Sequence, residues 1–123
     1  MTDQLTGIRI DNDGVLSTVS IYATNTHTRL LGMYQHIGCT TVDVIGLDGG
    51  IDVWVDDEGL YTQNPNPTLT LMLWLTRPFQ THLSGPGLFL RSNEDGDTQG
   101  LTPEQTATVI EWWQFAIAIV PVQ

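Results

Sequence analysis

Residues 42–67 decide the fold, and they read VDVIGLDGGIDVWVDDEGLYTQNPNP. Two runs rich in β-branched residues flank Leu47-Asp48-Gly49-Gly50. Asp-Gly between such runs is a strong local signal for a β-hairpin. The second run passes directly into the polar stretch Asp56-Asp57-Glu58-Gly59 and then into a repeated Asn-Pro pair. These residues predict a central hairpin that ends in an acidic corner.

A first hairpin and a helix are expected before this stretch. Ile8 and Ile10 alternate with a polar residue, and the turn signal Asp-Asn-Asp-Gly at 11–14 separates them from a second extended run that reaches Tyr22. From residue 26 to residue 37, apolar residues recur at spacings of three and four. That periodicity predicts an amphipathic helix, and the glycine that follows is suited to end it.

Two further helices and a short strand are expected after it. Residues 68–76 alternate leucines as a strand would, yet Asn66 is a suitable N-cap and Pro67 fits a first helical position, which favours a helix. Residues 88–90 predict a short apolar strand, and a polar loop follows. Thr102, with a proline next and a glutamine three residues later, forms a capping box for the last helix.

These elements predict one domain, residues 1–123, of the α+β class. We expect a mainly antiparallel sheet of hairpins with two or three helices packed on a face of it. The 123 residues can bury a core without disulfides, and no apolar run is long enough to span a membrane. The first residues have neither a basic start nor an apolar core, so we expect a cytoplasmic protein rather than an exported one.

The charge balance excludes several classes of partner. The chain has 14 acidic residues against 4 arginines and no lysine, which gives a net charge of −10. Neither nucleic acid nor an anionic membrane is expected as a partner, because both are held by clustered Lys and Arg. The lack of lysine also excludes Schiff-base chemistry and a phosphate-binding loop of the lysine type.

No metal or cofactor is expected. The loop 93–104 places oxygen ligands at some positions of a calcium loop, but Thr98 stands where that loop needs glycine, and a strand rather than a helix precedes it. His36 and Cys39 lack the further ligands that a metal site requires, so packing is the simpler interpretation of Cys39. No catalytic motif is present, and we expect no catalytic residue and no enzyme activity.

The acidic corner is the first candidate site. Asp56, Asp57 and Glu58 are consecutive, and alternation along a strand allows at most the first and third to converge. They could form a charged turn, or they could form a site together with Asn66. We expect Gly59 to take a positive φ angle and Asn66 to cap the helix that follows.

Aromatic residues form the second candidate site. Trp54 alternates with inward-pointing valines and should face away from the main core, and Trp112 should point sideways or outward on the last helix. With Tyr61 they could form a ligand or partner surface, or they could cover the edges of a small core. Exposed aromatic surface of this extent also predicts a homodimer.

Five segments carry a resemblance to a known family. They read GCTTVDVI, VWVDDEGL, NPNP, GPGLFL and LTPEQ, and over residues 8–110 the chain resembles the family called domain of unknown function 3846. The closest similarity lies at residues 55–60 and at Asn66, while Thr68 stands where the family usually has a smaller residue. The resemblance implies a small accessory protein of an actinobacterial phage, plasmid or related mobile element, and it implies no particular reaction.

Three functions are compatible with these features. The leading hypothesis is a non-enzymatic protein that binds a host protein or sequesters a small ligand, for example to blunt a host defence. A metal-assisted hydrolase that uses Asp56, Glu58 and Asn66 is the first alternative. A structural component of a virion is the second.

Overall fold

The computed structural model describes residues 4–76 and 82–120. Along the chain, its elements are β1 (Gln4–Ile10), β2 (Leu16–Tyr22), α1 (Thr26–Ile37), β3 (Val42–Gly46), the 3-10 turn η1 (Asp48–Gly50), β4 (Ile51–Asp56), α2 (Gly59–Thr62), α3 (Pro67–Thr76), β5 (Gly87–Ser92), β6 (Thr98–Gln99) and α4 (Pro103–Ile119). The sheet and its covering helices confirm the predicted α+β class.

The sheet is antiparallel throughout, in the order β2-β1-β5-β4-β3, and β6 pairs with the C-terminal end of β5. Both predicted hairpins are present. In the first, Gln4 lies opposite Tyr22, and in the second, Val42 lies opposite Asp56. β5 lies between the two hairpins, so Phe89 is opposite both Ile8 of β1 and Val53 of β4.

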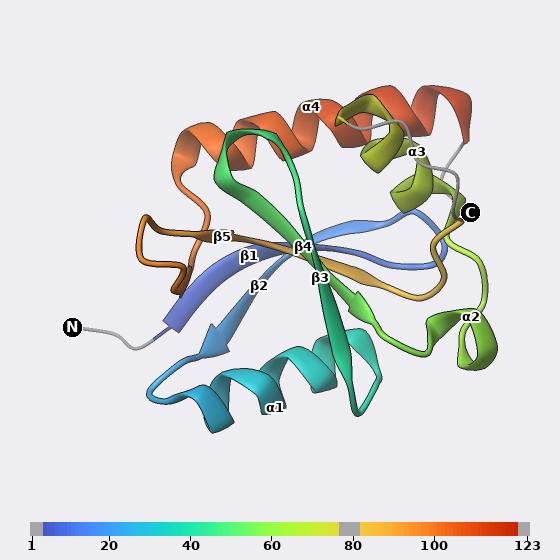
Figure 1. Cartoon of the computed structure of the whole chain (residues 1–123). Helices are drawn as coiled ribbons and strands as arrows, with labels where there is room; N and C mark the ends of the chain where they lie inside the picture. Colours follow the sequence, from blue (N-terminus) through green and yellow to red (C-terminus); the bar gives the residue numbers. More distant parts are fainter. Residues whose placement is uncertain (1–3, 77–81, 121–123) are drawn as a thin grey trace.

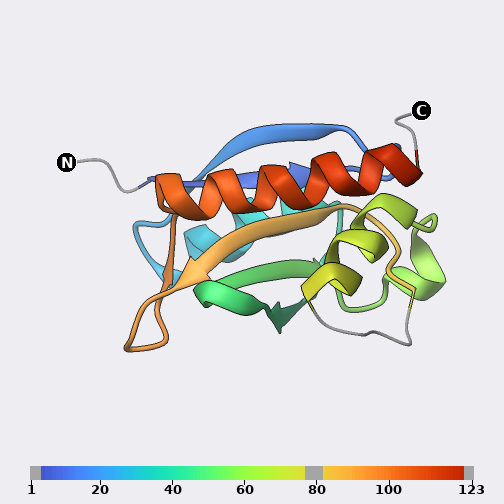
Figure 2. The same ribbon diagram turned by 90° about the horizontal axis from the view of Figure 1, so that it is seen from above.

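Helices cover both faces of the sheet, whereas the sequence led us to expect them on one face. Figures 1 and 2 show α1 on one side of the sheet and α3 and α4 on the other. β5 explains the second layer, because Leu88 and Leu90 pack with α1 residues while Phe89 between them belongs to the opposite core. A strand buried on both faces reads as a continuous apolar run rather than as an alternation.

The two cores differ in size. The larger one lies between the sheet and the pair α3 and α4, and its buried members are Ile8, Ile10, Ile51, Val53, Val55, Leu69, Met72, Leu73, Phe89, Val109 and Ala116. The smaller one lies under α1, and its buried members are Ile21, Met33, Ile37, Leu88 and Leu90.

The helices begin where the sequence indicated. Asn25 caps α1 by accepting from the Thr28 amide, and Thr102 and Gln105 form both hydrogen bonds of the capping box of α4. The ambiguous segment at 67–76 is a helix, and most of its residues up to Leu73 are buried. Of the helices in the described parts of the chain, none combines the length and the apolar character needed to cross a bilayer.

Candidate functional site

The acidic corner forms where β4 ends and α2 begins. We use the name for residues 56–59, Asp56 to Gly59. Across the sheet edge, the first of these residues pairs with Val42 of β3, and the amide of Asp57 donates to the Thr41 carbonyl at 3.2 Å. The corner is therefore anchored to the start of the neighbouring strand.

Asp56 holds the corner together. One carboxylate oxygen accepts from the Glu58 amide at 2.8 Å. The other accepts from the Thr62 hydroxyl and from the Gln63 side-chain amide, each at 3.1 Å. With three donors on its two oxygens, this carboxylate fixes the turn and the first residues of α2.

Gln63 extends this network to α1, the helix that covers the smaller core. Its Nε2 also donates to the carbonyl oxygens of Ile37 at 3.1 Å and Gly38 at 3.2 Å. These two carbonyls lie at the end of α1, where the helix leaves its last acceptors without intrahelical donors. The corner and the C-terminal end of α1 are thus parts of one hydrogen-bonded unit.

Gly59 is needed for a reason that the sequence did not suggest. Its φ angle is not positive, so the expectation of a left-handed residue was wrong. A Cβ placed at this position would instead lie 2.7 Å from the Ser84 carbonyl oxygen. The glycine allows α2 to approach the backbone just before β5, and this close approach closes one side of the corner.

Asn66 is a structural residue in the core. It is fully buried, and its Oδ1 accepts from the Leu69 amide at 3.0 Å, which confirms the predicted cap of α3. Its Nδ2 donates to the carbonyl oxygens of Ile10 at 3.3 Å and Gly85 at 3.0 Å. Both ends of its side-chain amide are occupied, so Asn66 does not join Asp56 and Glu58 in a common site.

Asp57 and Glu58 are the free carboxylates of the corner. Both side chains are exposed, and among the described residues neither has a hydrogen-bond or ion-pair partner. Leu60 and Tyr61 follow on α2 and are 70% and 87% exposed. Exposed acidic groups therefore lie beside exposed apolar surface.

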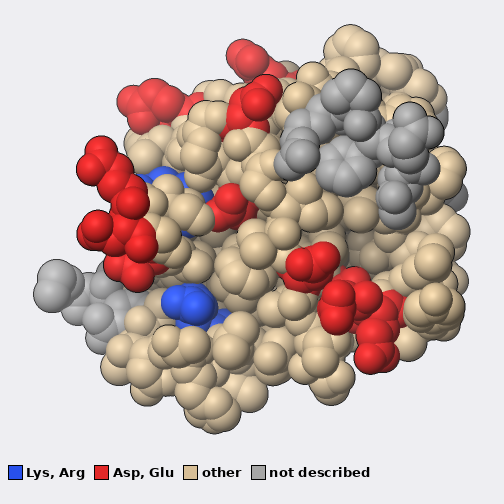
Figure 3. Space-filling model, in the orientation of Figure 1, with Lys and Arg blue, Asp and Glu red and all other residues tan. Residues whose placement is uncertain are grey.

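A pocket of about 310 Å³ opens beside these residues, and we call it the corner pocket. Its lining residues are Asp43, Ile45, Val55, Asp56, Asp57, Gly59, Leu60, His82, Leu83 and Ser84. Apolar side chains form much of its wall, and three carboxylates lie on it. In Figure 3, acidic side chains gather over the lower part of β3 and the approach to α2, with no Lys or Arg among them.

The aromatic candidates do not form one surface. Trp54 lies on the sheet face opposite Val53 and Val55, as predicted, but there it packs on the smaller core under α1. Trp112 is half-buried against the edge of the larger core. Of these three candidates, only Tyr61 is open to solvent. It does not line the corner pocket itself, but it follows Leu60, which does.

Sequence reasoning missed the residues that complete the pocket. Asp43 belongs to β3, and residues 82–84 precede β5. Neither segment carries a motif that points to a site. The antiparallel pairing of β3 with β4 offered a signal for Asp43, because that pairing places it opposite Val55.

A metal ion in a protein is typically held by a group of His, Cys, Asp or Glu side chains. Within residues 4–76 and 82–120, no three His, Cys, Asp or Glu side chains are grouped so that they could hold a metal ion. The Cys39 thiol is also poorly suited to chemistry, because burial and then the Asp56 carboxylate raise its pKa to about 11. A thiol in this state is protonated at neutral pH and is a weak nucleophile.

The family described as "Domain of unknown function (DUF3846)" matches residues 5–114. Neither the curated proteins nor the solved structures gave a significant match.

Proposed function

The chain belongs to the DUF3846 family, and we propose that it is a non-enzymatic binding protein that holds a basic segment of a protein partner at the corner pocket. If the gene is carried by a phage or plasmid, the partner is a host protein. Cationic side chains of the partner pair with Asp57, Glu58 and Asp43, and an apolar side chain enters the pocket beside Leu60.

One observation carries the proposal: free carboxylates lie beside exposed apolar side chains around a pocket. An exposed Tyr61 and Leu60 would gain from burial against a partner, and tyrosine is enriched among the residues that dominate binding energy. The overall charge of −10 would speed the encounter with a basic surface, and the local carboxylates would set its orientation.

The distribution of hydrogen bonds supports binding over hydrolysis. A hydrolytic site at the corner would need Asp56 and Asn66 free to hold a metal or a water molecule. Both side chains are instead engaged in hydrogen bonds that hold the fold. The groups that remain free, Asp57 and Glu58, are exposed charges of the kind that recognise a partner.

Site-specific photocrosslinking tests the proposal. A photoreactive phenylalanine analogue replaces Tyr61 in one preparation and Tyr22 in the other, since Tyr22 is 63% exposed at the end of β2. Each protein is irradiated in a lysate of cells that carry the gene, and the cross-linked peptides are identified by mass spectrometry. We expect a peptide rich in Lys and Arg to be captured from position 61 and not from position 22.

Capture from position 61 should fall as salt is raised, because pairs between exposed charges are screened. It should fall as well in the Asp57→Asn/Glu58→Gln variant. Equal capture from both positions, or captured peptides without an excess of basic residues, would contradict the proposal.

A further inference from the structure

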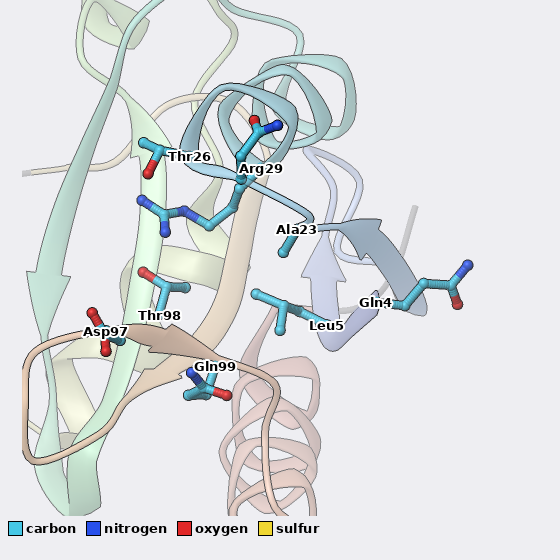
Figure 4. Close-up of a pocket in the computed structure, with 9 residues that line it drawn as sticks. Gln4, Leu5, Ala23, Thr26, Arg29, Asp97, Thr98 and Gln99 are labelled. Carbon is cyan, nitrogen blue, oxygen red and sulfur yellow. The ribbon is translucent and has the colours of Figure 1, made fainter. Parts of the chain in front are cut away.

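A second pocket, which we call the arginine pocket, lies at the other end of α1. It has a volume of about 430 Å³ and is lined by Gln4, Leu5, Ala23, Asn25, Thr26, Arg29, Asp97, Thr98 and Gln99. These residues come from β1, the segment between β2 and α1, the first turn of α1, and β6 with the residue before it (Figure 4). We propose that this pocket binds a small carboxylate ligand through the guanidinium group of Arg29.

Arg29 differs from the other two arginines that the structure describes. The Nε of Arg9 donates to the His36 carbonyl and that of Arg91 to the Gly100 carbonyl, each at 2.7 Å. The Nε of Arg29 is buried and has no hydrogen-bond partner among the described residues. A buried donor of a charged group without an acceptor is costly, so an acceptor from outside the fold would relieve that cost.

The surroundings of Arg29 offer further donors. In the view of Figure 4, its guanidinium lies between the side chains of Thr26 and Thr98. Thr26 is the first residue of the twelve-residue helix α1, whose cap, Asn25, already accepts from the Thr28 amide. The first amide groups of a helix lack intrahelical acceptors and carry a partial positive charge. Two hydroxyl groups thus lie beside the guanidinium, and the N-terminal end of α1 contributes to the same pocket.

The charge of the pocket selects the ligand class. A guanidinium presents parallel N–H donors that match the two oxygens of a carboxylate. Asp97 also lines the pocket, and the chain as a whole carries a charge of −10. Both would repel a phosphate dianion more strongly than a carboxylate monoanion. The volume lies within the range of small-molecule sites, roughly 300–1,000 Å³.

The arginine pocket does not depend on the proposed partner site. The corner is tied to the C-terminal end of α1 through Gln63, whereas the arginine pocket includes the N-terminal end of that helix. Failure of either proposal would leave the other standing.

Nuclear magnetic resonance of the arginine side chains tests the inference directly. The full chain labelled with ¹⁵N is titrated with acetate, with inorganic phosphate and with chloride at matched ionic strength, and the Nε–H signals are followed. We expect acetate to shift the Arg29 signal in a saturable way. The signals of Arg9 and Arg91 should not move, because their Nε–H groups already donate to carbonyls.

Two variants give the matched controls. Arg29→Gln removes both the charge and the parallel N–H donors of the guanidinium. It should weaken acetate binding at least tenfold, measured on the backbone amides of Thr26 and Thr98. Arg29→Lys keeps the charge but not the parallel N–H donors, and it should weaken acetate binding less than Arg29→Gln does. Because the Nε–H of Arg29 has no acceptor among the described residues, neither variant should melt at a lower temperature than the wild type.

Three results would overturn the inference. Acetate could shift Arg29 no more than chloride does, or it could bind Arg29→Gln as tightly as the wild type. Phosphate could bind more tightly than acetate, which would assign the pocket to phosphate and contradict the choice of carboxylate.

Discussion

At Gly59 the chain passes so close to Ser84 that an added Cβ would lie 2.7 Å from the Ser84 carbonyl oxygen. We expect Gly59→Ala to destabilise the protein by about 1–3 kcal/mol, because the backbone of α2 must move away from that oxygen. Gly46→Ala is the control, since its added Cβ would lie 3.8 Å from Asp52 Oδ1, an ordinary van der Waals distance, and it should change stability by less than about 0.5 kcal/mol. Chemical denaturation measures both, and wild-type stability of Gly59→Ala would refute the steric role.

Cys39 is expected to be unreactive in the folded protein. Burial, and then the carboxylate of Asp56, raise its pKa from 9.0 to about 11. At pH 8 this change lowers the thiolate fraction about 100-fold, and alkylation by iodoacetamide should slow by a similar factor relative to the protein in urea. Equal rates in the folded and unfolded protein would show that the thiol is not held in this environment.

The raised pKa of Cys39 also makes the free energy of unfolding depend on pH. The folded state favours the protonated thiol of Cys39, whose pKa is raised above its unfolded value. The unfolded state therefore loses this proton first, and the stabilisation, complete below about pH 9, is lost as the pH rises towards 11. Cys39→Ser should remove this part of the decline in a series of denaturation curves between pH 8 and pH 11.

At the scale of elements, Asn66 joins α3 to two other segments. It caps the helix and also donates to the carbonyl of Ile10, the last residue of β1, and to that of Gly85, which precedes β5. We expect Asn66→Ala to cost about 2–4 kcal/mol, because it removes a cap and leaves two buried carbonyls without this donor. Asn25→Ala removes only the exposed cap of α1 and should cost about 1 kcal/mol. Equal losses in denaturant would contradict the linking role.

The sequence predicted individual elements better than their arrangement. Hairpin turns and helix caps are local, so both hairpins and the starts of the long helices could be placed from a few residues each. The central position of β5 could not, because Gly87–Ser92 carries no signal that it inserts between β1 and β4. α2 has only four residues, too few for a periodic pattern to show.

The burial of α3 explains why its leucine-rich sequence was ambiguous between a helix and a strand. A helix that is apolar on nearly all sides has no polar stripe, so its periodicity does not distinguish it from a buried strand. The cap residue, Asn66, decided correctly in favour of a helix.

At the scale of the whole molecule, the candidate site is assembled from distant segments. The consecutive residues 56–61 could be identified from the sequence, since they form one polar and aromatic run. Asp43 and residues 82–84 reach the same pocket only through strand pairing and the approach of Gly59 to Ser84. Arg29 gave no signal at all, because a single arginine on an amphipathic helix is ordinarily solvated.

The homodimer remains a prediction, and its basis has changed. Trp54 and Trp112 are half-buried, so they supply little free surface. α4 also carries exposed apolar side chains, since Phe115 and Ile119 are each more than half exposed. We expect light scattering at high micromolar concentration to give a dimer, and Phe115→Ser/Ile119→Ser to give a monomer. A monomeric wild-type protein under these conditions would remove the prediction.

The central claim is that Asp57 and Glu58 bind a partner while their neighbours hold the fold. The most direct test is the affinity of Asp57→Asn/Glu58→Gln for the partner captured at position 61, measured by calorimetry beside its stability. The matched control is Glu94→Gln/Asp95→Asn, which removes the same two charges from the exposed loop before β6.

We expect the corner variant to keep its free energy of unfolding within about 0.5 kcal/mol of the wild type, because neither side chain has a hydrogen-bond or ion-pair partner in the described parts of the chain. We expect it to bind the partner at least tenfold more weakly, while the control variant binds nearly as the wild type does. If the corner variant binds the partner as tightly as the wild type, the acidic corner is a structural turn and the proposed function is wrong.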